Sequence, residues 1–432
     1  MNVKISPFSA NGKICAAASK SYAHRFLIAA ALCRGRTIIE NVGSSDDVNR
    51  TIDCLSALGA KISVSEGAAE VFGIERAQTG AKLYVGESGS TLRFLMPVVA
   101  ALGVSASFIC EKSLAERPIE GLIEVLTKHG AKIEKTSDGY FVNGKITAGE
   151  FDICGGVSSQ YLSGLLFALP LLKENSVLTT ENSVSKSYVD MTLSVLSGFG
   201  ILFDVKSENG KKWVYKSING QNQTYITKGK YTVDGDFSSS AAFLTLGALT
   251  GKVTVTNLTL DMQGDKAIIG ILKQAGARIT SGENFVSTEK RELKPVKYDF
   301  TDCPDLVPVV VAFCVFAKGV SELSGVGRLK FKECDRLKAC IEMCAAVGVK
   351  TECDGDTLKI YGGKRKAETG KQIIFKTYGD HRMVMAAALI AAGLNGESIG
   401  ESIIENAEAV NKSCPEFSEQ LKASGGNFNV II

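Results

Sequence analysis

Six copies of one short pattern recur along the chain at nearly constant intervals. The first copy is Leu55-Ser-Ala-Leu-Gly59-Ala-Lys-Ile62, and the others centre on Gly130, Gly200, Gly276, Gly348 and Gly425. Successive central glycines are 71, 70, 76, 72 and 77 residues apart. An apolar stretch that ends at a glycine and is followed by a new apolar residue is typical of a helix C-cap and the start of a strand. We therefore expect six copies of one supersecondary unit.

Between these patterns lie six strongly apolar segments, each preceded by small or ionisable residues. Runs such as Phe26–Leu32, Leu162–Leu172 and Met383–Leu394 are apolar on nearly every face, which is typical of buried helices. The first turn of a helix has four N–H groups without intrahelical acceptors and carries a partial positive charge that favours anions. We therefore expect several helix N-termini to face one cleft that binds an anionic ligand.

The composition limits the class of protein. With 432 residues, of which 45% are hydrophobic and 22% charged, the chain is long enough for two domains with large cores. Its formal net charge is only +3 and it has no long basic run, which argues against nucleic acid or a membrane as partner. The chain begins without a signal-peptide pattern, and its longest apolar runs, such as Val307–Ala317, are too short to span a bilayer. We expect a cytoplasmic protein.

Twelve cysteines are scattered through apolar segments and include no Cys-x-x-Cys pair. We expect them to be reduced and buried, not to form disulfides or a metal site. The sequence also lacks a P-loop and a Gly-x-Gly-x-x-Gly helix start. No metal and no nucleotide cofactor is expected.

The six units divide into three plus three, with a polar segment at Lys206–Thr232 near the midpoint. Each unit combines an apolar helix, an amphipathic helix that ends at the glycine, and short β-branched strands such as Thr37–Glu40 and Lys252–Asn257. This alternation predicts an α/β protein. The amphipathic helices are expected at ranges that include Asp46–Leu58, Ile119–His129, Met191–Gly198 and Asp335–Val347.

In the first half of the chain, candidate ligand-binding groups lie at helix starts. Lys20 and Ser21 begin one apolar helix, and Arg25 shares a face with Ser21, so the two can hold one anion unless this turn is simply solvated. The segment Glu87–Arg93 can form a nest of backbone N–H groups for phosphate, or an ordinary capped turn. Arg117 lies at another junction between a loop and a helix.

In the second half, Lys332-Glu333-Cys334-Asp335-Arg336 is the densest charged stretch. It forms either surface salt bridges or a site where the glutamate exchanges protons and the lysine and arginine bind phosphate or carboxylate. Asp305, at the head of a buried helix, is an N-cap, a general base or both. Asp380-His381-Arg382 precedes another buried helix, and its arginine favours a functional site.

Cations therefore lie at the starts of elements in five different units, together with two acids, Asp305 and Glu333. This many positive groups suits two small substrates that carry phosphate and carboxylate groups, with further hydrogen bonds from Ser158, Ser159 and Ser185. We expect a group-transfer site with proton transfer and without a metal or nucleotide cofactor. The cations are Lys20, Arg25, Arg93, Arg117, Lys332, Arg336, Arg382 and Lys412.

These residues resemble, in order and along the whole chain, the motifs of the 5-enolpyruvylshikimate-3-phosphate synthase family of enolpyruvyl transferases. The combination of motifs is highly specific. It comprises Ser-Lys-Ser-x-x-x-Arg at 19–25, Ser-Gly-Ser-x-x-Arg at 88–93, Glu-Arg-Pro at 116–118, Val-Ser-Ser-Gln at 157–160, Ser-Lys-Ser-Tyr at 185–188, Pro-Asp at 304–305, Lys-Glu-x-Asp-Arg-Leu at 332–337, Asp-His-Arg-Met at 380–383 and the late Lys412.

The resemblance implies an α/β fold of two similar domains, each an inside-out α/β barrel of three βαβαββ units. The helix N-termini would face an active site in the cleft between the domains. The first strand would belong to the C-terminal domain, so the expected boundaries are 18–234 for the N-terminal domain and 1–17 plus 235–432 for the C-terminal domain.

The resemblance also implies the reaction. The enzyme would transfer the carboxyvinyl group of phosphoenolpyruvate to the 5-hydroxyl of shikimate 3-phosphate and release phosphate, in the shikimate pathway of aromatic amino acid biosynthesis. Asp305 would accept the hydroxyl proton, and Glu333 or Lys20 would protonate the methylene carbon. The domains would close over the substrates and exclude water. We expect a monomer that binds only these two small molecules and needs no cofactor.

The same resemblance assigns two sets of ligand-binding residues. Phosphoenolpyruvate would contact Lys20, Gly89, Arg117, Gln160, Arg336, Arg382 and Lys412. Shikimate 3-phosphate would contact Lys20, Ser21, Arg25, Ser158, Ser159, Gln160, Ser185, Tyr188, Asp305 and Lys332, with Arg93, Asp236 and His381 in supporting positions.

Four departures from the family pattern border the implied phosphoenolpyruvate pocket. The chain has Ala17-Ala18 where the family often has Pro-Gly, and Ser90 where threonine is usual. It has Phe94 where proline is frequent and Ser88 where many members have alanine. These positions bear on the response to inhibitors such as glyphosate and leave the expected activity in place.

Two other functions compete with this interpretation. The related UDP-N-acetylglucosamine enolpyruvyl transferases have Lys-Asn in place of Lys20-Ser21 and a reactive cysteine in the loop near Arg117. That loop, Lys112–Pro118, contains no cysteine here, and Cys110 precedes it. A non-catalytic scaffold for anionic polymers would need a broad basic surface, which a net charge of +3 does not favour.

Overall fold

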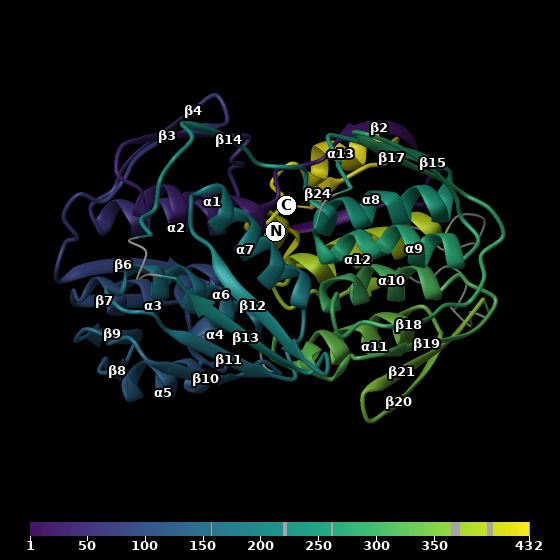
Figure 1. Ribbon diagram of the computed structural model, residues 1–432. Helices are drawn as coiled ribbons and strands as arrows, with labels where there is room; N and C mark the ends of the chain where they lie inside the picture. The colour runs from purple at the N-terminus through teal and green to yellow at the C-terminus, as the bar shows by residue number, and fades with distance from the viewer. Residues whose placement is uncertain (157, 219–222, 261, 364–371, 395–400, 432) are drawn as a thin grey trace. The chain divides into compact units, whose positions relative to one another are not determined.

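The computed structural model describes residues 1–156, 158–218, 223–260, 262–363, 372–394 and 401–431 (Figure 1). The chain divides into two compact units. Unit 1 contains Met1–Ala17 and Asp234–Ile432, and unit 2 contains Ala18–Val233. The polar segment expected near the midpoint ends unit 2, and its residues 219–222 lie outside the described part of the chain.

Three apolar helices form the centre of unit 2. Because they are apolar on nearly all faces, they are buried along most of their length. They are α1 (Lys20–Leu32), α3 (Gly89–Leu102) and α6 (Ser159–Ala168), the last continued by η1 (Leu169–Leu171). The amphipathic helices α2 (Asp46–Ala57), α5 (Glu120–Lys128) and α7 (Lys186–Gly198) bury one face each, and α4 (Lys112–Ala115) is a single turn.

Unit 1 repeats this arrangement. Its three buried helices, α8 (Phe237–Thr250), α10 (Val307–Cys314) and α12 (His381–Gly393), pack side by side (Figure 1). Its amphipathic helices are α9 (Ala267–Gln274), α11 (Arg336–Ala346) and α13 (Phe417–Ala423). Short 3-10 helices precede or join these elements: η3 (Gly264–Lys266), η4 (Pro304–Leu306), η5 (Gly327–Phe331) and η6 (Ala407–Lys412).

The described strands form six four-stranded sheets, and all six have the same pairing order: one parallel pair followed by two antiparallel pairs. In unit 2 the sheets are β14 (Lys230–Thr232), β3 (Arg36–Glu40), β5 (Ala68–Phe72), β4 (Lys61–Ser65); β6 (Ala81–Gly86), β7 (Ala106–Cys110), β9 (Gly139–Asn143), β8 (Lys132–Thr136); and β10 (Glu150–Cys154), β11 (Val177–Glu181), β13 (Lys212–Ser217), β12 (Phe203–Glu208).

In unit 1 the sheets are β2 (Asn11–Cys15), β15 (Lys252–Thr256), β17 (Phe285–Glu289), β16 (Arg278–Gly282); β18 (Lys297–Asp299), β19 (Gly319–Ser324), β21 (Thr357–Gly362), β20 (Lys350–Asp354); and β22 (Ile374–Phe375), β23 (Ser402–Ile404), β1 (Asn2–Ile5), β24 (Asn429–Ile431). The first two strands of the chain thus complete two sheets of unit 1. β2 pairs in parallel with β15, and β1 lies between β23 and β24.

The six-fold repeat predicted from the glycine pattern is confirmed. All six pattern glycines follow an amphipathic helix and have φ between 70° and 113°, the left-handed region that a helix C-cap requires. At Gly59 a Cβ atom would also lie 2.8 Å from the carbonyl oxygen of Arg76. Glycine is therefore required at this position both for the backbone conformation and for space.

One helix begins earlier than its apolar pattern indicates. The sequence predicts a helix from Met191, but α7 begins at Lys186. Its first turn is polar, and the hydrophobic pattern alone does not detect it. In the part of the chain that the structure describes, no helix combines the length and apolarity needed to cross a membrane.

Candidate active site

In unit 1, Arg336 lies at the centre of three carboxylates. Its guanidinium donates to Asp380 through Nε (2.7 Å) and Nη2 (3.2 Å), to Asp305 through Nη1 (2.7 Å) and to Glu333 through Nη2 (2.6 Å). We call these four residues the carboxylate–arginine network. Burial alone would lower the pKa of Arg336, but Asp380, Glu333 and Asp305 raise it well above its usual value, so the guanidinium stays charged.

Two helix caps position this network. Asp335 accepts a hydrogen bond from the backbone N–H of Lys338 (3.0 Å), so Arg336 becomes the first residue of α11. Asp380 caps α12 by accepting from the backbone N–H of Arg382 (2.8 Å) while it also binds Arg336. Asp380 therefore connects the starts of α11 and α12.

Asp305 is an ionised carboxylate held by cations. Its Oδ1 accepts from Lys332 (2.9 Å) and Arg336 (2.7 Å), and its Oδ2 lies 4.0 Å from Nη2 of Arg382. Burial would raise the pKa of Asp305, but the charges of Lys332, Arg336 and Arg382 hold it well below its usual range. The N-cap hypothesis for Asp305 is wrong, because Cys303 occupies the N-cap of η4, which leads directly into α10.

Arg382 lies in the second position of α12 and is buried. Its Nη1 donates to the carbonyl oxygen of Ser238 (2.7 Å), in the first turn of α8. Asp236 caps that helix by accepting from the backbone N–H three residues ahead (2.9 Å). His381 is also buried, with Nδ1 3.8 Å from Oδ1 of Asp380. The predicted site residues of three repeats of unit 1 are thus brought together at helix starts.

Lys412, the last predicted cation, is the final residue of η6 in unit 1. Its side chain is buried, with 6% exposed. A lysine is rarely buried to this degree unless its charge is compensated.

In unit 2, Arg25 is buried against neutral acceptors. Nε donates to Thr192 Oγ1 (2.8 Å), Nη1 to the carbonyl of Ser21 (2.7 Å), and Nη2 to the carbonyl of Tyr188 (3.0 Å) and to Ser163 Oγ (3.3 Å). Burial lowers the pKa of Arg25 to about 10, which leaves the guanidinium charged at neutral pH. Because these acceptors are neutral, the positive charge remains available to an anionic ligand.

Arg93 joins α3 to α6 and to the loop before α5. Its Nη1 donates to Oε1 of Gln160 (2.8 Å) and its Nη2 to the carbonyl of Pro118 (3.2 Å). Gln160 also donates to Ser90 Oγ (2.9 Å), and the Tyr161 hydroxyl donates to the same Pro118 carbonyl (2.6 Å). Arg93 therefore fixes the orientation of Gln160 and the loop that carries Arg117.

Arg117 is buried with unsatisfied donors. Its Nε and Nη2 have no hydrogen-bond partner among the described residues. Gly89 lies against it: a Cβ atom there would be 3.6 Å from Nη1 of Arg117 and 2.7 Å from Nη1 of Arg93. Gly89 begins α3, whose N-cap is Ser88. A buried guanidinium with free donors beside a helix N-terminus is the arrangement that a bound anion would complete.

The predicted serines lie at two further helix starts of unit 2. Ser158 caps α6 by accepting from the backbone N–H of Gln160 (3.2 Å), and Ser159 is the first residue of the helix. Ser185 precedes α7 with φ 53° and ψ 47°, a left-handed conformation that costs a non-glycine residue about 1–3 kcal/mol. Tyr188 lies in the first turn of α7.

Lys20, the first residue of α1, forms an ion pair with Asp47 of α2 (2.7 Å). Asp47 and the neutral acceptors Ser163 and Thr192 were not among the residues predicted for the site. Each of these is a polar residue that its helix buries, and that exception to the apolar pattern is the signal that could have identified them. The burial of a polar residue does not, however, show which cation that residue contacts.

A buried histidine connects three helices of unit 2. His24 is 1% exposed, and its Nδ1 lies 2.7 Å from Thr51 Oγ1. The series continues from Thr51 to Thr91 Oγ1 (2.7 Å) and on to Ser88 Oγ (2.7 Å), the N-cap of α3. Burial lowers the pKa of His24 to about 3, so the imidazole is neutral. This series of hydroxyl groups therefore ties α1 to the helix start that carries Gly89.

The pKa of His24 predicts that unit 2 is sensitive to acid. An unfolded chain would protonate this histidine below its ordinary pKa of 6.5, whereas the folded chain would not until about pH 3. The stabilisation is thus present above pH 6.5 and lost as the pH falls toward 3. Between pH 6.5 and 4.5 this protonation of the unfolded chain lowers the unfolding free energy by about 2 kcal/mol.

Urea unfolding at a series of pH values checks this prediction. His24→Asn should be less stable than the wild type at pH 7, because it loses packing, but its stability should fall less between pH 6.5 and 4.5. His129→Asn, at the partly exposed C-cap of α5, is the matched control and should keep the wild-type slope. Parallel slopes for His24→Asn and the wild type would contradict the prediction.

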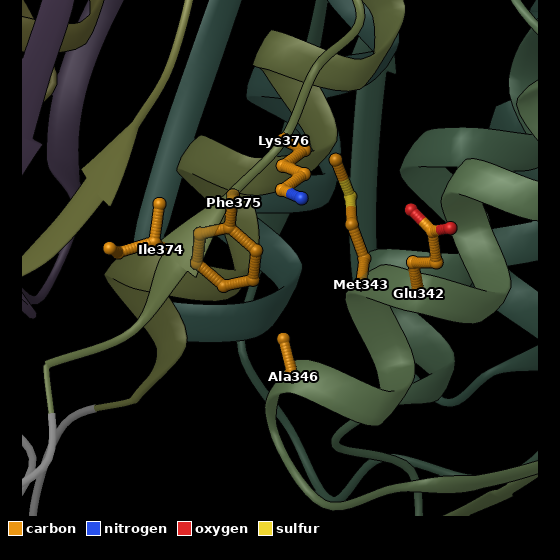
Figure 2. Close-up of a pocket in the computed structure, with 6 residues that line it drawn as sticks. All are labelled: Glu342, Met343, Ala346, Ile374, Phe375 and Lys376. Carbon is orange, nitrogen blue, oxygen red and sulfur yellow. The ribbon is translucent and has the colours of Figure 1, made fainter.

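A pocket lined by described residues lies elsewhere in unit 1. It measures about 250 Å³ and lies between α11 and β22, lined by Glu342, Met343, Ala346, Ile374, Phe375 and Lys376 (Figure 2). The ring of Phe375 and the side chains of Met343 and Ala346 give it an apolar wall. No predicted site residue lines it.

Comparisons with known proteins agree with the sequence motifs. The sequence model of one protein family, described as EPSP synthase (3-phosphoshikimate 1-carboxyvinyltransferase), matches residues 6–421. A 3-phosphoshikimate 1-carboxyvinyltransferase of Clostridium novyi (strain NT) is 36% identical, over 98% of both chains. The protein of that name from Clostridium beijerinckii (strain ATCC 51743 / NCIMB 8052) is 35% identical, over 99% of this chain and 98% of its own.

Solved structures confirm the predicted α/β fold. The EPSP synthase of Acinetobacter baumannii superposes with a TM-score of 0.79 at 23% identity and full coverage of both chains. The enolpyruvyl transferase NikO of Streptomyces tendae superposes with a TM-score of 0.76 at 16% identity, over 99% of this chain and 98% of its own. At these identities the likeness concerns the fold alone.

Proposed function

Because the chain belongs to the EPSP synthase family, we propose that it transfers the carboxyvinyl group of phosphoenolpyruvate to the 5-hydroxyl of shikimate 3-phosphate and releases phosphate. Curated relatives that are 34–36% identical over nearly the whole chain carry the name of this activity. The observation on which the proposal rests is Asp305, an ionised carboxylate held in place by Lys332 and Arg336 at the start of a buried helix.

In the proposed mechanism, Asp305 accepts the proton of the 5-hydroxyl as its oxygen bonds to C2 of phosphoenolpyruvate. Glu333 or Lys20 delivers a proton to the methylene carbon, which gives a tetrahedral intermediate. The bond from C2 to the phosphate oxygen then breaks, the methyl group returns its proton, and the double bond reforms. Arg336 orients Asp305 and Glu333, since it donates to both.

The substrates are anions, and the buried cations supply their partners. We propose that phosphoenolpyruvate contacts Lys20, Gly89, Arg117, Gln160, Arg336, Arg382 and Lys412. Shikimate 3-phosphate contacts Lys20, Ser21, Arg25, Ser158, Ser159, Gln160, Ser185, Tyr188, Asp305 and Lys332. The neutral surroundings of Arg25 and the free donors of Arg117 support these assignments.

The decisive experiment measures phosphate release from phosphoenolpyruvate with two acceptors in parallel. Release with shikimate 3-phosphate and not with UDP-N-acetylglucosamine is the expected result. The opposite result would support the alternative activity, that of a UDP-N-acetylglucosamine enolpyruvyl transferase. Release with neither acceptor would refute both activities.

Arg117 offers a specific test of donor binding. Arg117→Lys keeps a charge but lacks the planar donors, and we expect KM for phosphoenolpyruvate to rise about 10- to 100-fold, the loss of one or two charged hydrogen bonds. KM for shikimate 3-phosphate should change much less. Arg76→Lys, at an exposed position of the same unit, is the control. Equal increases in both KM values would contradict the assignment of Arg117 to phosphoenolpyruvate.

We also propose that the enzyme is a cytoplasmic monomer that needs no cofactor. The small net charge and the absence of recognisable cofactor motifs in the sequence support this view. Light scattering at micromolar concentration tests the oligomeric state. Full activity after dialysis against a chelator would agree with the absence of a required metal.

A further inference from the structure

Asp265 is a buried acid of unit 1 with no part in the reaction proposed above. It lies in η3, just before α9, and is 0% exposed. Its Oδ1 has no hydrogen-bond partner among the described residues. Burying a carboxyl group with an unsatisfied oxygen is costly, so a residue of this kind usually has a function that offsets the cost.

The other carboxyl oxygen connects Asp265 to a proposed substrate-binding residue. Oδ2 accepts a hydrogen bond from the hydroxyl of Ser238. The backbone carbonyl of that serine accepts from Nη1 of Arg382 at 2.7 Å. Ser238 is therefore held on one side by Asp265 and on the other by Arg382, and it fixes the two relative to one another.

The charged groups that face Asp265 come from three elements of unit 1. Arg382 belongs to α12, Asp305 belongs to η4, and Asp236 caps α8. The thiol of Cys303, next to η4, is neutral because burial raises its pKa. Burial and the charges of Asp305 and Asp236 raise the pKa of Asp265 to about 6, against the opposing effects of Arg382 and the Ser238 hydroxyl. The group therefore changes charge within the range in which enzymes are assayed.

Asp265 in turn acts on Arg382. Burial lowers the pKa of Arg382, but the charges of Asp305 and Asp265 raise it above its usual value. The guanidinium still has an unsatisfied donor, because its Nε is buried without a hydrogen-bond partner among the described residues. An ionised Asp265 is thus a counter-charge that competes with any anion for Arg382.

We propose that Asp265 is a positioning residue that holds Arg382 through Ser238 and whose ionisation sets how strongly Arg382 attracts the anionic donor substrate. This inference rests on the proposed function, in which Arg382 binds phosphoenolpyruvate. Protonated Asp265 keeps the hydrogen bond to Ser238 and adds no charge. Ionised Asp265 keeps that bond but neutralises part of the guanidinium charge.

Two substitutions separate these effects. Asp265→Asn retains an acceptor for Ser238 and removes the charge, whereas Asp265→Ala removes both. Asp302→Asn, an exposed acid just before η4, controls for the loss of one negative charge in the same unit. KM for phosphoenolpyruvate and for shikimate 3-phosphate is measured from pH 5 to 7.5 for each protein.

The ratio of wild-type to Asp265→Asn KM for phosphoenolpyruvate should be near one at pH 5 and rise to about 10-fold above pH 7, from the interaction of two nearby charges. Using the ratio removes the titration of the substrate phosphate itself, which also occurs near pH 6. Asp265→Ala should have a higher KM for phosphoenolpyruvate than Asp265→Asn at every pH, because Arg382 then also loses its support through Ser238. KM for shikimate 3-phosphate should stay nearly constant across the series.

A ratio that does not change with pH, or Ala and Asn variants that behave alike, would overturn the proposal. If Asp265→Ala does not fold, Ser238→Ala tests the same connection by removing the hydroxyl. It should raise KM for phosphoenolpyruvate and leave that for shikimate 3-phosphate nearly unchanged, and an unchanged KM for both substrates would refute the connection.

A stability measurement distinguishes failure of this inference from failure of the proposed function. The pKa of Asp265 in the folded protein lies above the 3.8 of a free carboxyl group, so its stabilising contribution is present at low pH and lost as the pH rises through about 6. Relative to wild type, the unfolding constant of Asp265→Asn should therefore fall by about 10²-fold between pH 4 and 7.5. If the wild type is inactive but the unfolding constant changes in this way, the proposed function is refuted, and with it the role of Asp265 in donor binding. The ionisation of Asp265 would then still be established. An active wild type without this change would refute the ionisation alone.

Discussion

Asp305→Asn is expected to lower kcat about 10²- to 10⁴-fold, the range associated with loss of a general base. The amide keeps the shape of the carboxyl group and its contact with Lys332 and Arg336, but it cannot accept the hydroxyl proton. KM for phosphoenolpyruvate should stay constant or fall, because the substitution removes a negative charge close to three cations. Steady-state kinetics with both substrates measures the two constants separately.

The pH profile adds a second criterion. Because cations hold the pKa of Asp305 well below its usual range, the base is already ionised near neutral pH. The acidic limb of the wild-type kcat profile should therefore come from another group. Asp302→Asn, which neutralises an exposed acid three residues earlier, should retain wild-type kcat. An Asp305→Asn enzyme with more than about a third of wild-type kcat would refute the assignment of the base, since that loss is far below the range given above.

Arg336→Met is expected to destabilise the protein by about 3–5 kcal/mol and to abolish activity, because removing one partner of a buried ion pair leaves uncompensated charge. Asp305, Glu333 and Asp380 would lose their common donor, and Asp380 is completely buried. The pKa of Asp305 is held low partly by Arg336, so this carboxyl group should take up a proton more readily in the variant, and the loss of stability should be smaller near pH 4 than at neutral pH. Urea unfolding at pH 7 and at pH 4 measures both values.

The same helix offers a matched control. Lys338, two residues later in α11, lies 4.0 Å from Glu342, and both side chains are exposed. An exposed pair at this spacing contributes about 0.3–0.5 kcal/mol, so Lys338→Ala should have little effect on stability. If Arg336→Met and Lys338→Ala cost similar amounts, the network does not carry the stability that its geometry indicates.

The repeats and the helix starts are predictable from sequence because both depend on local chemistry. A left-handed C-cap requires glycine at Gly59 and its five equivalents, and a buried helix must be apolar on every face. Each of these requirements leaves a pattern within about twenty residues. The order of the strands within a sheet is harder to predict from the sequence. Once the order in one sheet is known, however, the six-fold repeat predicts the same order in the other five.

The partners of the site residues could not be predicted in the same way. Arg336 meets Asp380 44 residues later, and Arg25 meets Thr192 167 residues later. Both contacts depend on how whole helices pack against each other. The sequence periodicity of a single helix does not predict that packing. Asp305 shows the same limit: its position at a helix start allowed an N-cap, a general base or both, but did not indicate its contacts with Lys332, which follows η5, and with Arg336 of α11.

The position of the first two strands has a consequence for how the chain folds as the ribosome releases it. Unit 2 is an insertion in unit 1, and all of its residues emerge by Val233. Val3 of β1, in contrast, must wait for Ile404 and Val430, its partners in the two neighbouring strands. Native contacts this distant in sequence form late and leave strand edges open to other chains meanwhile. Strand β1 therefore stays unpaired until β23 has been synthesised, long after the residues of unit 2 have emerged, and its open edge is where a chaperone would be most useful.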